Sequence, residues 1–143
     1  MDSRITVTAV RVRGFHLDGY GHVNHARYLE FLEEGRWAYV DAHPEFAEGL
    51  AKGVALVAVN LNIDYRRAAV MNDDLEVETC LTRVGGRSGV VGHRITHVGS
   101  GELVASATLT FVLLDQQSGQ VIPMEGEWAE RLGPLVVDMA ETK

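Results

Sequence analysis

The sequence of 143 residues contains a single cysteine, Cys80, and only three prolines. One cysteine excludes a disulfide framework within the chain, so the core must be held by packing, and a reducing compartment is expected. The longest apolar stretch, Gly53 to Val59, is far shorter than the ~20 residues that a membrane-spanning helix needs. The first four residues lack the charged-then-apolar pattern of a secretory signal. We therefore expect a soluble, cytoplasmic protein without a membrane span.

Positive charge is also scarce, because 13 Lys and Arg residues face 20 Asp and Glu residues, for a formal net charge of -7. Proteins that bind nucleic acids by neutralising phosphates need the opposite balance, so no nucleic-acid partner is expected. A local basic patch can still bind an anionic ligand. The apolar fraction of 46% is that of an ordinary globular chain. The length predicts a single domain over residues 1–143.

Apolar periodicity predicts one long helix and five strands. Helical spacing connects Tyr28, Leu32, Gly35, Tyr39 and Ala42 within residues 24–42, and Phe31 and Trp37 widen the apolar stripe. Period-two alternation predicts strands over residues 4–13, 55–65, 75–81, 91–96 and 103–113. In the second strand the inward face is assigned to the odd positions from Ala55 to Tyr65. One short helix is expected in the tail from Gln116 to Lys143.

The connectors between the last four strands carry turn residues, at positions 72–74, 85–87 and 99–102. Short turns between successive strands indicate hairpins and hence an antiparallel sheet. One long helix packed on such a sheet is an α+β architecture, in which about five strands wrap around the helix. The helix covers one face only and the sheet edges stay open, so we expect a second copy of the chain to pair with an edge.

Potential chemistry is concentrated between Gly14 and Tyr28, a segment with one acid and three histidines that runs directly into the predicted helix. A helix N-terminus presents unpaired backbone N–H groups and the positive end of the helix dipole, which stabilise a developing oxyanion. Asp18 precedes this terminus in a glycine-containing loop that can fold back over it. A carboxylate opposite a carbonyl held on helix N–H groups is sufficient for acyl transfer or hydrolysis.

The string from Asp18 to Tyr28 resembles the Asp-x-x-Gly-x-Val-x-x-x-x-Tyr signature of hotdog-fold acyl-CoA thioesterases, of the 4-hydroxybenzoyl-CoA thioesterase type. The stretch from Ile63 to Ala69 and the following Asn-Asp-Asp-Leu are similar to the family's Asp-Tyr-x-Arg-Pro-Ala and Gly-Asp-x-Leu. Two residues depart from the pattern, since Ala68 replaces the proline and Asn72 the glycine. The resemblance covers roughly residues 4 to 115.

This resemblance implies a hotdog fold and the hydrolysis of acyl-CoA to a free acid and CoA, with no separate cofactor and no metal. It implies that Asp18 is the catalytic carboxylate, as a nucleophile or as a base for water. It also implies that the backbone N–H of His25 polarises the thioester carbonyl and that Arg67 binds a CoA phosphate. The family's assembly implies a homodimer or a dimer of dimers, with each site shared between two subunits.

Four further residues are candidates for substrate or CoA contact, and each has an ordinary structural alternative. Arg66 is either a second phosphate ligand or a solvated charge. His22 is either a substrate contact or a loop histidine, and Asn24 either orients the loop or caps the helix. Tyr28 lies on the apolar stripe, where a core position is the more common role. Asp18 itself is either the catalytic carboxylate or a turn-forming or capping residue.

Two other functions stay open on the sequence. One is a non-catalytic module that binds acyl-CoA or an acyl carrier; the other is a hotdog hydratase or dehydratase with an Asp–His pair. His93 and His97 share a strand face as a conceivable metal pair, but core or interface packing is favoured because no acidic or cysteine ligand is near in sequence. The acyl group is not determined; the candidates for lining its pocket are Phe31, Trp37, Tyr39, Val57, Val59 and Phe111.

Overall fold

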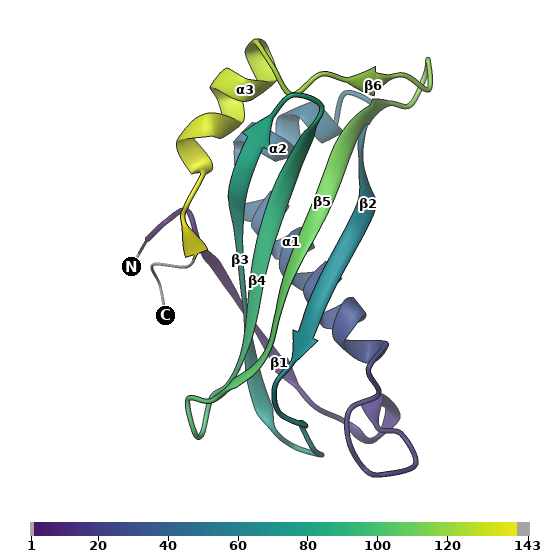
Figure 1. The fold of residues 1–143 in the computed structure, drawn as a ribbon, viewed down its shortest axis with the longest axis vertical. Helices are drawn as coiled ribbons and strands as arrows, with labels where there is room; N and C mark the ends of the chain where they lie inside the picture. The colour runs from purple at the N-terminus through teal and green to yellow at the C-terminus, as the bar shows by residue number, and fades with distance from the viewer. Residues whose placement is uncertain (1, 140–143) are drawn as a thin grey trace.

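The computed structural model describes residues 2–139, which form one antiparallel sheet with a long helix against it (Figure 1). The strands are β1 (Thr6–Arg11), β2 (Val54–Tyr65), β3 (Asp74–Gly85), β4 (Ser88–His97), β5 (Leu103–Asp115) and the short β6 (Val121–Ile122). The helices are α1 (Arg27–Ala42), α2 (Pro44–Leu50) and α3 (Glu127–Leu132), with single 3-10 turns at Gly14–His16 and Gly133–Leu135. The predicted α+β class is confirmed. Within residues 2–139, no helix has the length and apolarity to cross a membrane.

Helix α1 runs along one face of the sheet, behind the strands in Figure 1. Its buried residues are Tyr28, Phe31, Leu32, Gly35 and Tyr39, most of the predicted stripe. Glycine is required at position 35, because a Cβ atom there would lie 2.6 Å from the Thr79 hydroxyl and 2.9 Å from a Val77 methyl group. Trp37 does not belong to the buried stripe as predicted, since its side chain is 57% exposed.

The ends of α1 differ slightly from the prediction. The helix begins at Arg27 rather than Asn24, after a turn, and it ends before His43-Pro44 as expected. The sequence analysis missed α2, which starts at Pro44 itself. Proline suits the first position of a helix, because its fixed φ is helical and its missing N–H needs no partner there. The proline that ends one helix therefore begins the next.

The inward face assigned to β2 is wrong for its first half. A register shift between Ala58 and Asn60 marks a β-bulge, which inserts one residue and exchanges the two faces of the strand. Before the bulge, Val54 and Leu56 pack into the core, and after it Leu61 and Ile63 do. Val57 and Val59, predicted to point inward, are 37% and 56% exposed.

The sheet order is β1-β3-β4-β5-β2, with β6 paired to β5. The turns after β3 and β4 are hairpins, as predicted. The turn at residues 72–74 is not, because β2 pairs with β5 and the chain then crosses the sheet to β3. This crossover makes β2 an edge strand. It also carries the segment after β2 past the start of α1, where the candidate site lies.

Candidate active site

Asp18 lies in a small hairpin that is closed by a bridge between Leu17 and Val23. The Asp18 N–H donates to the His22 carbonyl oxygen at 2.8 Å. Its Oδ1 accepts hydrogen bonds from the backbone N–H groups of Tyr20 at 2.9 Å and His22 at 3.3 Å. Oδ2 accepts none from residues 2–139. Oδ1 therefore shapes the turn through its two hydrogen bonds. These bonds also orient Oδ2, which is available to a substrate or a water molecule.

The backbone N–H of His25, like Oδ2 of Asp18, has no hydrogen-bond partner within residues 2–139. Its neighbours are satisfied: Asn24 donates to the His16 carbonyl oxygen at 2.9 Å, and Arg27 to that of Asn24 at 2.8 Å. Ala26 donates to Oδ1 of Asn24 at 2.9 Å, so the Asn24 side chain caps the turn that leads into α1. Within the described range the His25 N–H has no acceptor. It is thus an available donor beside the N-terminus of α1.

Two tyrosines hold this corner in place. The Tyr65 hydroxyl, at the end of β2, donates to the His25 carbonyl oxygen at 2.9 Å. The Tyr28 hydroxyl accepts the Ala69 N–H at 3.3 Å, and the two tyrosine rings lie 5.4 Å apart. Tyr28 is only 3% exposed, so its packing favours the core interpretation over substrate contact. The sequence analysis missed Tyr65, although it stands in the Asp-Tyr pair of the second motif.

His22 and its neighbour join the hairpin to the crossover. The His22 backbone pairs with Val70, and the Val23 N–H donates to the Ala69 carbonyl oxygen at 2.9 Å. His22 is itself exposed. Its backbone is therefore structural, while its imidazole faces solvent at the rim of the hairpin.

Arg67 contacts the turn between β4 and β5. Its Nη1 donates to the Ser100 hydroxyl at 3.0 Å and lies 3.9 Å from Oε1 of Glu102. The side chain of Arg67 is 32% exposed, so its guanidinium is positioned by the protein but is still accessible to an anion. A half-exposed ion pair of this length is weak and does not prevent the exchange of Glu102 for a phosphate.

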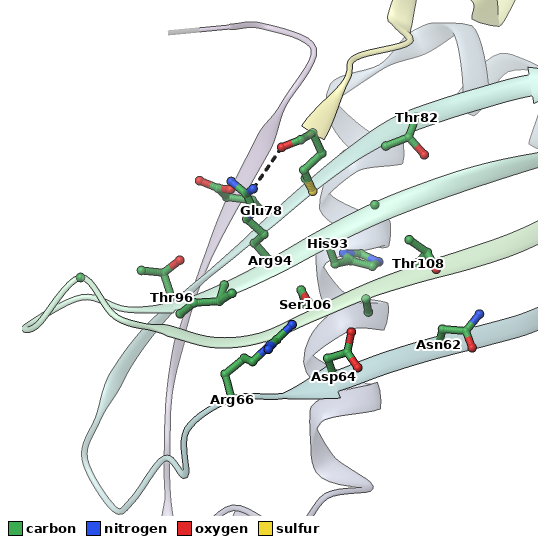
Figure 2. Close-up of a pocket in the computed structure, with 15 residues that line it drawn as sticks. Asn62, Asp64, Arg66, Glu78, Thr82, His93, Arg94, Thr96, Ser106 and Thr108 are labelled. Carbon is green, nitrogen blue, oxygen red and sulfur yellow. Dashed lines mark hydrogen bonds between the residues drawn. The ribbon is translucent and has the colours of Figure 1, made fainter. Parts of the chain in front are cut away.

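Arg66 lies elsewhere, in a cavity of about 830 Å³ on the face of the sheet opposite α1 (Figure 2). Asp64, Glu78 and Arg94 line the same cavity, and Arg94 donates to the Met139 carbonyl oxygen at 3.1 Å. None of the lining residues belongs to the Asp18 hairpin or the start of α1. The structure therefore separates the two adjacent arginines: Arg66 lines this cavity, whereas Arg67 contacts Ser100 and Glu102 in the turn between β4 and β5.

A second cleft, of about 630 Å³, lies between α1 and the edge strand β2. Trp37, Val40, Val54, Leu56 and Ala58 contribute its apolar lining, and Glu33 and Arg36 supply charge. Of the aromatic side chains proposed for an acyl pocket, Trp37 lines this cleft. The other three, Phe31, Tyr39 and Phe111, are buried in the core.

His93 and His97 have separate partners. His93 lies under α1, with Nδ1 3.1 Å from the Thr79 hydroxyl and Nε2 3.3 Å from Nη1 of Arg36. Burial, reinforced by the positive charge of Arg36, lowers the pKa of His93 to about 3. His97 contacts Asp73 and Ser100 instead. His93 is thus packed in the core, the alternative that the sequence analysis favoured, whereas His97 makes polar contacts with residues of two turns.

A family profile described as "Thioesterase-like superfamily" matches residues 12–132. The chain belongs to this superfamily. It is 44% identical to the long-chain acyl-CoA thioesterase FadM of Escherichia coli (strain K12), over 90% of this chain and 98% of that protein. It is 31% identical to the putative acyl-CoA thioesterase YneP of Bacillus subtilis (strain 168), over 76% and 79% of the two chains.

The solved structures agree. The crystal structure of YbaW, a probable thioesterase from Escherichia coli, superposes with a TM-score of 0.84 at 44% identity, over 92% of this chain and 98% of that one. The hotdog thioesterase fold that the two sequence motifs predicted is confirmed.

Proposed function

We propose that the protein is an acyl-CoA thioesterase in which Asp18 and the His25 N–H carry the reaction. The observation that supports this most directly is the pairing of an open, oriented carboxylate oxygen with an open N–H at one loop–helix junction. The thioester carbonyl oxygen would accept the His25 N–H, which stabilises the charge that develops on this oxygen. Water adds across the thioester, and the products are the free acid and CoA.

Asp18 can supply the attack in two ways. As a base it removes a proton from water, which then attacks the carbonyl carbon while the CoA thiolate leaves and takes up a proton. As a nucleophile it attacks the carbonyl carbon and expels the CoA thiolate, which takes up a proton, and water hydrolyses the resulting mixed anhydride in a second step. Both routes use the oxygen that has no hydrogen bond within residues 2–139.

The proposed substrate is a long-chain acyl-CoA. The name of the 44% identical FadM supports this class, and so does the apolar cleft beside α1, which is open to a flexible hydrocarbon chain. In this arrangement Arg67 contacts a CoA phosphate. The acyl chain extends from the N-terminus of α1 along the helix toward Trp37.

The proposed assembly is at least a homodimer, in the cytoplasm, that pairs through β2. This strand is a twelve-residue edge of the sheet, it flanks the apolar cleft, and it ends at Tyr65, which contacts His25. A partner strand would satisfy its open backbone groups and cover Val57 and Val59.

The test is thiol release from a panel of short, long, branched and aromatic acyl-CoAs. We expect hydrolysis to be fastest for the long chains. An enoyl-CoA absorbance assay on the same samples distinguishes hydration from hydrolysis. Binding of acyl-CoA without thiol release from any panel member would contradict the proposal and favour the non-catalytic binding module.

A further inference from the structure

A chain of polar contacts joins the Asp18 hairpin to Arg67, and His97, the last residue of β4, stands in its middle. Nε2 of His97 lies 3.3 Å from Oδ1 of Asp73, and Nδ1 lies 2.9 Å from the Ser100 hydroxyl. The side chains of His97 and Asp73 are 16% and 15% exposed. The contact is therefore largely shielded from water, unlike a surface ion pair.

On one side, this network supports the hairpin. The second carboxylate oxygen of Asp73 accepts the Val70 N–H at 2.9 Å. Val70 pairs with His22, and the adjoining Ala69 accepts the Val23 N–H. The carboxylate of Asp73 thus anchors the segment on which the Asp18 hairpin rests.

On the other side, the network positions Arg67. The Ser100 hydroxyl oxygen accepts Nη1 of Arg67 at 3.0 Å and the Glu102 N–H at 3.2 Å. The backbone N–H of Ser100 donates to Nδ1 of His97 at 3.0 Å, so Nδ1 carries no proton and Nε2–H faces Asp73. The imidazole of His97 therefore accepts at Nδ1, toward Ser100, and donates at Nε2, toward Asp73.

Asp73, His97 and Ser100 stand in the order of an acid–histidine–serine triad, but they do not form a nucleophilic one. The Ser100 oxygen accepts two hydrogen bonds, from Arg67 and Glu102, while its proton faces Nδ1. A hydroxyl oxygen has two lone pairs, and both are occupied, so none is left to attack a carbonyl carbon. The geometry points to a role in positioning.

We propose that His97 is a positioning residue that holds the Asp18 hairpin and Arg67 as one unit. This inference rests on the proposed function, in which the hairpin acts on the thioester and Arg67 binds a CoA phosphate. Both ends of the substrate must be held in register, because a displacement of about 1 Å at a reacting group costs on the order of 100-fold in rate. His97 sets this register through its two ring nitrogens.

Two substitutions separate the two contacts. In His97→Gln the amide nitrogen replaces Nε2 and keeps the donor toward Asp73, whereas the acceptor toward Ser100 is lost. In His97→Asn the amide oxygen replaces Nδ1 and keeps the acceptor, whereas the donor is lost. We expect His97→Gln to raise KM and the Kd for CoA about fivefold with little change in kcat. We expect His97→Asn to lower kcat about threefold with little change in KM.

The matched control is Val98→Ala, an exposed neighbour whose backbone bond to Asp74 is kept and whose constants should equal those of the wild type. In the double variant Arg67→Ala with His97→Gln, KM should equal that of Arg67→Ala alone, because the contact that His97 supports is already gone. If the two substitutions multiply their separate effects on KM in the double variant, the inference is overturned. The same holds if kcat, KM and the Kd for CoA of both His97 variants equal those of the wild type. A lower Tm with an unchanged kcat and KM would assign His97 to packing alone.

Calorimetric titration with CoA keeps the two proposals separable. If the wild type hydrolyses no acyl-CoA, the proposed function fails. The Kd for CoA then still decides whether His97 acts on Arg67, since a Kd unchanged by His97→Gln and Val98→Ala alike would contradict it.

Discussion

At the scale of the residue, Asp18 combines a structural and a chemical role in one carboxylate. Oδ1 accepts two backbone N–H groups that shape the hairpin, and Oδ2 is left open by the described part of the chain. The sequence analysis set a turn-forming role against a catalytic one. The geometry makes the two compatible, because they use different oxygens.

We expect Asp18→Asn to lower kcat by about 100-fold or more without loss of the fold. The amide oxygen can replace Oδ1 in the turn, but the amide nitrogen is neither a base nor a nucleophile. Thiol release and the Tm are the measurements. Asp41→Asn, at the far end of α1 and exposed, is the matched control. Activity within a few-fold of the wild type would overturn the assignment of Asp18.

His25 should act through its backbone, so His25→Ala keeps the donor and we expect kcat within about threefold of the wild type. His25→Pro removes this N–H, while the backbone hydrogen bonds that Asn24 and Ala26 donate do not depend on it. We expect this variant to lose about 100-fold in kcat, the usual effect of removing one oxyanion donor. An equal loss in both variants would mean that the imidazole takes part.

Arg67→Ala should raise KM for acyl-CoA about tenfold at low salt, with a smaller effect on kcat. A remote phosphate contact contributes about equally to the bound substrate and to the transition state. Added salt should reduce the difference between variant and wild type. Arg87→Ala, in the exposed turn between β3 and β4, controls for net charge. An unchanged KM at low salt would return Arg67 to a purely structural role.

At the scale of the element, the packing of α1 on β3 and β4 is close and partly polar. Gly35 allows the close approach, and His93 lies beneath the helix between Thr79 and Arg36. Periodicity predicted that this helix packs on this sheet. The alternation of His93 with Val91 and Ile95 also favoured a packed position for this residue, which is 1% exposed, but it did not identify Thr79 and Arg36 as the partners of the ring.

This buried histidine makes the stability of the protein depend on pH. Its pKa in the folded state is about 3, below its ordinary value of 6.5. As the pH falls below 6.5, the unfolded chain binds a proton that the folded chain excludes until about pH 3. The contribution of His93 to the free energy of unfolding is thus fully present above pH 6.5. It is lost as the pH falls from 6.5 toward 3, by up to about 1.4 kcal/mol per pH unit.

The measurement is the free energy of unfolding in denaturant, compared between the wild type and His93→Gln at several pH values. Carboxylates titrate in both proteins. The difference between the two proteins in the slope of unfolding free energy against pH therefore reports the contribution of His93. The charged group that faces the ring is Arg36 from α1, and Glu78 contributes through its backbone. Equal slopes below pH 6.5 would contradict this account.

At the scale of the whole molecule, the two edges of the sheet are unlike. β1 has six residues, whereas β2 has twelve and borders the apolar cleft. Open β-strand edges are sites of association. The predicted antiparallel sheet with a helix on one face therefore leads to a prediction about assembly.

We expect sedimentation at micromolar concentration to show at least a dimer, and Val59→Lys to yield a monomer with little activity. A charged side chain at an edge opposes strand pairing. Val7→Lys on the other edge, where the valine is 41% exposed, is the matched control and should stay assembled and active. A fully active monomer would contradict both the pairing through β2 and a site shared between subunits.

The sequence by itself determined the features that depend on neighbours along the chain. These include the stripe of α1, five alternating strands, two of the hairpins, and the motif that places Asp18 and His25 before a helix. Side-chain periodicity and turn chemistry are local, so they can be read without coordinates.

Only the tertiary structure decided which strands pair, and the site depends on that pairing. Alternation marks a strand but not its partner, so nothing in residues 72–74 showed that β2 pairs with β5 and that the chain then crosses the sheet to β3. One residue inserted at the bulge in β2 reversed its faces. The same long-range pairing parts Arg66 from Arg67, aims Tyr65 at His25, and brings Asp73, His97 and Ser100 together. Such contacts join residues far apart in sequence, and their free energy exists only once the sheet has formed.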